Sequence, residues 1–212
     1  MKAFILLLTC SILFFSCKPQ ISIKAGTSDD ATIFFSTGFS ESTAKTLKSV
    51  SGSDMDAPLF NKDDVLMLLK SAGAINTSAT LPNQNEITTI GTLPSLQNHP
   101  LSQAGLITKN QKKLSLTLGP KQITAFYELL TEDAKAYLDL MMIPALIGET
   151  MSVKEYRELL SSMYGPSFAN EIVDGKLTIN LSSPNGKTKV EETLNLGELL
   201  TANEEKSWSI TF

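Results

Sequence analysis

Cysteine and histidine, the side chains that most often serve as nucleophiles, bases and zinc ligands, are scarce in this chain of 212 residues. Its two cysteines are Cys10 and Cys17, and its only histidine is His99. Zinc sites need clustered Cys and His residues, and Ser/His/Asp catalysis would have to rest on His99, for which the sequence supplies no nucleophile elbow. We therefore expect no metal site, no cofactor and no catalytic residue, with His99 an ordinary residue of a loop.

Neighbouring carboxylates are more frequent, but each pair has a simpler explanation than metal binding. Asp54 and Asp56 have the spacing that begins a calcium loop, yet an Ala-Pro pair follows where that loop needs another ligand and a glycine. Asp63 and Asp64 suit the positive N-terminal end of a helix. The sequence also contains no Walker loop, dinucleotide glycine fingerprint or metalloprotease box.

The first 17 residues are organised as an export signal. Lys2 precedes an apolar run over residues 3–15, and Ser16 and Cys17 close it. A basic start, a short apolar core and a small residue at its end are typical of secretory signal peptides. The run is shorter than the roughly 20 apolar residues that a permanent transmembrane helix needs. We therefore expect this segment to direct export rather than to form part of the fold.

An apolar core followed by a small residue and a cysteine resembles the lipobox of bacterial lipoproteins, with Phe14 where that box usually has leucine. The resemblance covers the leader alone. It implies that residues 1–16 are a lipoprotein signal peptide, and that Cys17 is lipidated with a diacylglycerol on its thiol and a fatty acid such as palmitate on its amine. Two or three acyl chains anchor a protein durably. The implied place is the bacterial cell envelope, lipid-anchored to a membrane and facing the periplasm or the cell surface.

Two alternatives to lipidation at Cys17 stay open. Cys10 has Leu7 at the favoured position, but Thr9 is bulky for a cleavage site and few residues precede it. An ordinary cleaved signal peptide, or a start that stays in the membrane, would leave the protein without an acyl chain. Of the two cysteines, Cys17 fits the lipobox better.

Composition limits the partners of the exported part. Both cysteines lie in or at the end of the leader, which excludes a disulfide framework. The leader takes Lys2 with it, leaving 17 basic and 22 acidic residues and a net charge of −5. An acidic balance argues against nucleic acid and against adsorption to anionic headgroups. Arg157 is the only arginine, so no arginine cluster is available to bind phosphate. We expect membrane contact through the acyl chains on Cys17.

Alternating apolar residues and helix caps predict an α+β fold, with a mostly antiparallel sheet and helices packed on one face. We expect residues 17–20 to be the lipidated cysteine and a short tether, and residues 21–212 to be a single α+β domain. Residues 93–105 contain two prolines and little periodicity, so we expect irregular structure there. Hairpins are expected within residues 21–37, 75–92, 106–118 and 177–194, and a last strand through Trp208 and Ile210. Leu114, Leu116 and Leu118 alternate with polar residues, as in a strand with one buried face.

Helices are expected over residues 41–50 with Ser40 as the cap, from Asn61, Pro120, Thr131 and Ser152, and over 168–173. Ser152 and Glu155 have the spacing of a capping box.

Two segments share one order of parts, which suggests an internal duplication. Each has a strand, a glycine, helices, a glycine, a strand, a Pro-Asn turn and a strand. Gly73 precedes Pro82 by nine residues, and Gly175 precedes Pro184 by nine. Coincidence is the alternative, because these parts recur in any α+β chain.

The richest apolar region lies between residues 123 and 163. Methionine and aromatic side chains at helical spacing usually form a core, but they also adapt to a ligand or a partner groove. The candidate ligand-binding layer consists of Phe126, Tyr127, Met141, Met142, Tyr156 and Met163.

The sequence thus favours a membrane-anchored envelope lipoprotein that acts as a non-enzymatic structural or binding module, with a protein or lipid partner and no nucleic acid. One alternative is a carrier that holds a lipid or another apolar ligand in a helical pocket. A second is an unrecognised hydrolase that uses His99. An enclosed cavity would favour the carrier, a packed interior with an exposed apolar patch would favour a protein partner, and a cleft bringing His99 to a serine and a carboxylate would favour the hydrolase.

Overall fold

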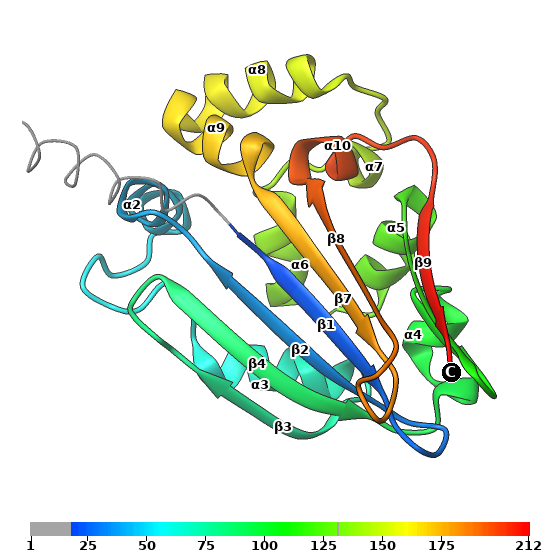
Figure 1. Ribbon diagram of the computed structural model, residues 1–212. Coiled ribbons are helices and arrows are strands. Elements are labelled where there is room, and N and C mark those ends of the chain that lie inside the picture. The colour runs from blue at the N-terminus through cyan, green and yellow to red at the C-terminus, as the bar shows by residue number, and fades with distance from the viewer. Residues whose placement is uncertain (1–17, 131) are drawn as a thin grey trace, which may run out of the picture.

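The computed structural model describes residues 18–130 and 132–212, and its centre is a six-stranded sheet beside a sheet of three strands (Figure 1). The large sheet has the order β3-β4-β2-β1-β7-β8, and all neighbours are antiparallel except β1 and β7. The small sheet, β5-β6-β9, is antiparallel. The predicted α+β class with a mostly antiparallel sheet is confirmed. The strands are β1 (Gln20–Ala25), β2 (Ala31–Gly38), β3 (Ile75–Thr80), β4 (Glu86–Leu93), β5 (Ile107–Asn110), β6 (Lys113–Leu118), β7 (Lys176–Ser182), β8 (Lys189–Asn195) and β9 (Lys206–Thr211).

Alternation along the strands decides which face of each sheet is buried. In β1, Ile23 is 1% exposed while Lys24 beside it is exposed, as expected where successive side chains point to opposite faces. The apolar faces of the two sheets share one core. Its sheet residues include Ile23, Ala25, Ala31, Leu93, Leu114, Leu116, Leu177, Ile179, Leu181, Trp208 and Ile210.

Helices cover one face of the large sheet and one of its ends, and among the described residues they leave the other face open (Figure 1). Helix α3 lies on the covered side, where Leu69 and Ala72 join the sheet core. Helices α2, α8 and α9 lie beyond the end at which β1 begins (Figure 1). The helices are α2 (Glu41–Ser51), α3 (Lys62–Ser71), the 3-10 helix η1 (Leu96–Asn98), α4 (Pro100–Gln103), α5 (Pro120–Glu128), α6 (Glu132–Asp139), α7 (Pro144–Ile147), α8 (Val153–Tyr164), α9 (Pro166–Asp174) and α10 (Leu196–Leu200).

The segment predicted to be irregular, residues 93–105, is more ordered than expected. It contains the end of β4, η1 and α4. Leu96 and Leu101 are 0% and 6% exposed and belong to the sheet core. Helices of three and four residues are too short to give a periodic pattern, so burial by the rest of the protein, and not local sequence, orders this segment.

Helices α8 and α9 form a hairpin around a second apolar core. The predicted capping box is present: the Ser152 side chain accepts from the Glu155 N–H, and the Glu155 carboxylate accepts from the Ser152 N–H. Tyr156 is fully buried and donates its hydroxyl to the Met141 carbonyl at 2.6 Å. Burial raises the pKa of its phenol. The buried members of this second core are Tyr156, Leu160, Phe168, Ala169, Ile172 and Val173.

A buried lysine joins the two sheets. Lys109, in β5, is 9% exposed. Its ammonium donates to the carbonyls of Gly26 at 2.9 Å and Asp30 at 3.2 Å, and to that of Ser28, all in the turn between β1 and β2. Burying a charge is costly unless it is hydrogen-bonded, and these carbonyls meet that need while fixing the small sheet to the turn.

The strand pairing reproduces only part of the suggested duplication. The order β2-α2-α3-β3-β4 is followed by β6, further helices, β7 and β8, as the sequence pattern suggested. The two hairpins correspond, because β4 pairs with β3 and β8 pairs with β7. The strands before the helices differ, since β2 pairs with β4 in the large sheet whereas β6 pairs with β5 and β9 in the small sheet.

The only arginine links the two helices of the hairpin. Both terminal nitrogens of Arg157 bind Asp174, at 2.7 and 2.9 Å, and one also donates to Asn170 at 2.7 Å. The hydrogen bond from Arg157 lowers the pKa of the Asp174 carboxyl. The Asp174 side chain is 60% exposed, so solvent screens the pair.

We predict that Asp174→Asn lowers the free energy of unfolding by about 0.5 kcal/mol at neutral pH, the value expected for an exposed pair. Because the folded-state pKa is depressed, the contribution is complete above the ordinary carboxyl pKa of about 4 and is lost as the pH falls below it. Urea denaturation of both proteins at neutral and acidic pH measures this, and a difference that persisted in acid would contradict the assignment.

Candidate functional site

The chain enters the large sheet directly after Cys17. Lys18 is exposed, whereas Pro19 is buried and its carbonyl accepts from the Thr178 N–H at 2.9 Å. Gln20 is already in β1, beside Ser36 of β2. We expected a tether over residues 17–20, but Gln20 belongs to β1 and Pro19 is bound by Thr178. The tether is therefore shorter than predicted. Cys17, the expected lipidation residue, lies outside the described residues.

A helical cap covers this end of the sheet. We define the end cap as α2, the following loop (residues 52–60), α8 and α9; its interior is the second apolar core, to which Phe39 and Leu47 also contribute. Figure 1 shows these helices beyond the starts of β1 and β7. Lipidation at Cys17 would thus attach the acyl chains at the end of the protein that carries this cap.

A carboxylate from α9 holds the beginning of α2 in the cap. The Ser40 N–H donates to Glu171 Oε1 at 2.6 Å, and the hydroxyls of Ser40 and Thr43 donate to Oε2 of the same carboxylate. The Ser40 hydroxyl also accepts from the Thr43 N–H at 3.3 Å, as a helix cap does. A negative charge is favoured here because the helix N-terminus carries a partial positive charge. Nothing in the local sequence signals this contact.

The segment between Phe39 and Phe60 leaves the sheet and returns to it at one place. The Phe39 N–H donates to the Asn85 carbonyl at 3.1 Å, and the Leu59 N–H donates to the Gln84 carbonyl at 2.8 Å. The rings of Phe39 and Phe60 stack with their centroids 6.1 Å apart. Both ends of this excursion are therefore fixed at the turn between β3 and β4, which lies at the same end of the sheet as the start of β1.

Two large apolar side chains of this excursion face solvent. Val50, near the end of α2, is 47% exposed, and Met55, in the loop, is 48% exposed. The loop is held against the helix because the buried Lys48 ammonium donates to the Met55 carbonyl at 3.0 Å. The end cap thus presents apolar side chains on a supported backbone.

The open face of the large sheet is mostly uncharged and polar. Phe34 of β2 lies opposite Ile90 of β4, which is 44% exposed. The register places hydroxyl-bearing side chains around this pair. They include Ser22, Ser36, Thr88, Thr92, Thr178 and Ser182. This face thus presents one apolar pair among hydroxyl-bearing side chains.

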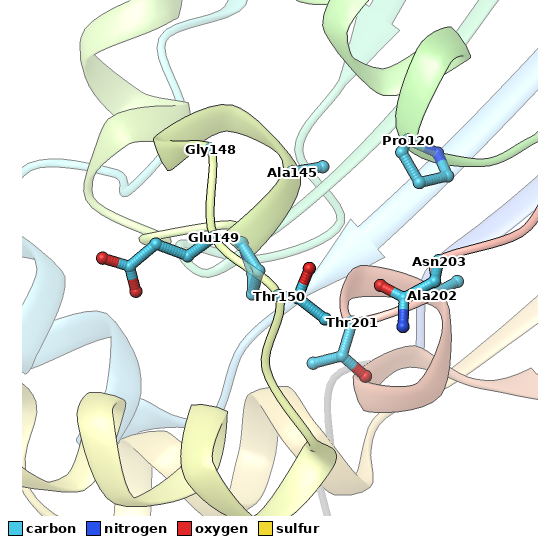
Figure 2. Close-up of a pocket in the computed structure, with 9 residues that line it drawn as sticks. Pro120, Ala145, Gly148, Glu149, Thr150, Thr201, Ala202 and Asn203 are labelled. Atoms are coloured by element: carbon cyan, nitrogen blue, oxygen red, sulfur yellow. The ribbon is translucent and has the colours of Figure 1, made fainter.

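The structure contains a groove of about 460 Å³ elsewhere, between the start of α5, α7 and the segment after α10. Figure 2 shows the Glu149 carboxylate pointing away from Thr201 and Asn203, so the polar side chains do not converge. The groove is lined by Pro120, Pro144, Ala145, Gly148, Glu149, Thr150, Thr201, Ala202 and Asn203. None of these belongs to the candidate ligand-binding layer.

The six residues of that layer are divided between different environments. Phe126 packs against the sheet core, whereas Tyr156, Met141 and Met142 belong to the second core. Met163 is 50% exposed. The six side chains therefore do not line one common pocket.

Tyr127, the sixth member of the layer, makes polar contacts near α6. Its hydroxyl donates to Asp139 at 3.0 Å, a hydrogen bond that raises the pKa of the phenol. The Lys135 ammonium lies 5.4 Å from the centre of its ring. These contacts tie α5 to α6.

His99 lies in the connection between η1 and α4, as the sequence suggested, but it is buried. It is 4% exposed and caps α4, with Nδ1 accepting from the Leu101 N–H at 3.2 Å. Its Nε2 is buried without a hydrogen-bond partner among the described residues and faces Gly73, where an added Cβ would lie 2.6 Å from it. The side chain is therefore packed between the start of α4 and the backbone at Gly73.

Asp54 and Asp56 form a turn. The Asp56 N–H donates to Asp54 Oδ1 at 3.0 Å, and both residues are exposed. Within the described residues, acidic, His and Cys side chains do not gather in groups of three or more that could hold a metal ion. Nor does any helix of that part of the chain have the length and apolar character to cross a membrane.

In comparisons with known proteins, no protein-family model, curated protein or solved structure matches this chain.

We predict that Glu171→Ala lowers the free energy of unfolding by about 2 kcal/mol, because it leaves donors at the start of α2 without their charged acceptor. Glu158→Ala is the matched control, since Glu158 is exposed and its Oε1 lies 3.7 Å from Lys154 Nζ. We expect this variant to change the free energy of unfolding by no more than about 0.5 kcal/mol. Urea denaturation measures both, and equal effects would contradict the role given to Glu171.

Proposed function

We propose that this protein is a lipid-anchored lipoprotein of the bacterial cell envelope, and that its α+β domain acts as a non-enzymatic structural or binding module facing the periplasm or the cell surface. The observation that carries the proposal is the hydrogen bond between the Pro19 carbonyl and the Thr178 N–H. It joins the sheet to the chain two residues after the cysteine of the lipobox-like leader. An acyl group on Cys17 would then anchor a folded body directly.

Two further observations support a binding module over the alternatives. The methionine-rich layer that a carrier would use is split between two packed cores. The side-chain contacts of His99 are with backbone groups, in contrast to the serine and carboxylate that a hydrolase would need. The open sheet face, with Phe34 opposite Ile90, supplies a broad surface for a partner.

We predict that Cys17→Ser abolishes lipidation and that Cys10→Ser leaves it intact, because only the thiol of Cys17 receives the diacylglycerol. The full chain is expressed in a bacterial host, the cells are fractionated, and the N-terminal peptide is weighed by mass spectrometry. The wild-type and Cys10→Ser proteins should be found in the membrane fraction with an acylated residue 17. An unmodified Cys17, or acyl groups on the Cys17→Ser protein, would overturn the anchor.

We also predict that the delipidated domain carries no lipid when purified from its host, because Tyr156 and its neighbours leave the second core packed. Native mass spectrometry checks this. A lipid-sized adduct would contradict the binding module and favour the carrier, whereas a retained protein partner would support the module.

A further inference from the structure

We infer that the end cap touches the bilayer directly, with Val50 and Met55 inserted among the lipid headgroups. This goes beyond attachment by acyl chains alone, and it rests on the proposed lipidation of Cys17. The end cap would contact a zwitterionic membrane at the level between the headgroups and the acyl chains.

The reach of the chain forces this end of the protein to the membrane. Consecutive Cα atoms are about 3.8 Å apart, so the Cα of Cys17 lies within about 8 Å of that of Pro19. Pro19 is buried and bound to Thr178. A lipidated Cys17 would therefore hold the end cap against the bilayer surface, with no flexible linker to let the domain move away.

The apolar side chains on the end cap are placed to make that contact. The excursion from Phe39 to Phe60 begins and ends at the end of the sheet where β1 starts. Val50 and Met55 are about half exposed on it, at 47% and 48%. Exposed apolar side chains next to an acyl anchor lower the free energy of the bound state when they enter the interface.

The charges of residues 40–60 favour a zwitterionic membrane surface over an anionic one. Residues 40–60 contain three acidic and two basic residues, and Asp54 and Asp56 flank Met55. These carboxylates would be repelled by anionic headgroups and suit the ammonium groups of zwitterionic ones. The contact should therefore need no anionic lipid.

A single-cysteine probe tests the inference. In the lipidated protein the thiol of Cys17 is bonded to diacylglycerol and Cys10 has left with the leader, so Met55→Cys supplies the only free thiol. The full-length gene is expressed, and the processed, lipidated protein is labelled with an environment-sensitive fluorophore. It is then bound to phosphatidylcholine vesicles whose acyl chains carry bromine, which quenches emission on contact.

Ile75→Cys is the matched control. Ile75 is 50% exposed, as Met55 nearly is, but it lies at the opposite end of the large sheet, opposite Thr92. Thr92 in turn pairs with Thr32, which lies beside Lys24 near the end of β1. The two labelled residues are thus similarly exposed, and both variants carry the same acyl anchor. They differ in their distance from Cys17.

We expect the Met55→Cys label to lose about half of its emission and the Ile75→Cys label almost none, because interfacial side chains lie about 5–10 Å deep. Adding Val50→Asp should reduce the quenching at residue 55 while the protein still floats with the vesicles. Equal quenching at both sites, or none at residue 55 in protein that floats, would overturn the inference alone. Protein that neither floats nor carries acyl groups would overturn the proposed function with it.

Discussion

The parallel pairing of β1 with β7 is the contact on which the rest of the structure depends. Gln20 lies beside Thr178, and Lys24 beside Ser182, so the earliest strand after Cys17 is a central strand of the large sheet. This pairing joins the β3-β4-β2-β1 half of the sheet to β7 and β8. It also brings α9, which directly precedes β7, to the beginning of α2. The sheet core and the end cap both require it.

Local features of the fold were accessible from the sequence because they depend on neighbouring residues. The caps at Ser40, Asn61 and Ser152 and the proline that opens α5 are all present. Each is decided within one helical turn. Alternation in the strands likewise identified the buried faces, as at Leu114 and Leu116.

Contacts between distant segments could not be predicted, because no local pattern encodes them. Glu171 looks like an ordinary acidic residue of a helix until α2 is placed beside it. Lys109 looks like a solvent-exposed residue of a strand, yet its ammonium is surrounded by carbonyls of another turn. For the candidate site, helical spacing showed that Phe126 and Tyr156 face inward but not that they face different cores.

The sheet core and the second core have different structural roles. The sheet core fixes the strands and leaves the opposite face, with Phe34 and Ile90, open to solvent. The second core gives the end cap its own rigid interior, in which the Tyr156 hydroxyl binds the Met141 carbonyl. Exposed side chains on the cap are therefore displayed by a packed body, so that their orientation relative to the sheet is set by the fold.

The place of β1 in the sheet also determines when the protein can fold. A chain that emerges in sequence order from a ribosome or a translocation channel presents β1 early and β7 late. The central pair of the large sheet then cannot form until residues 176–182 have appeared, and contacts between such distant segments form slowly. The large sheet is thus completed only after most of the chain has emerged, an order of events that suits the proposed export.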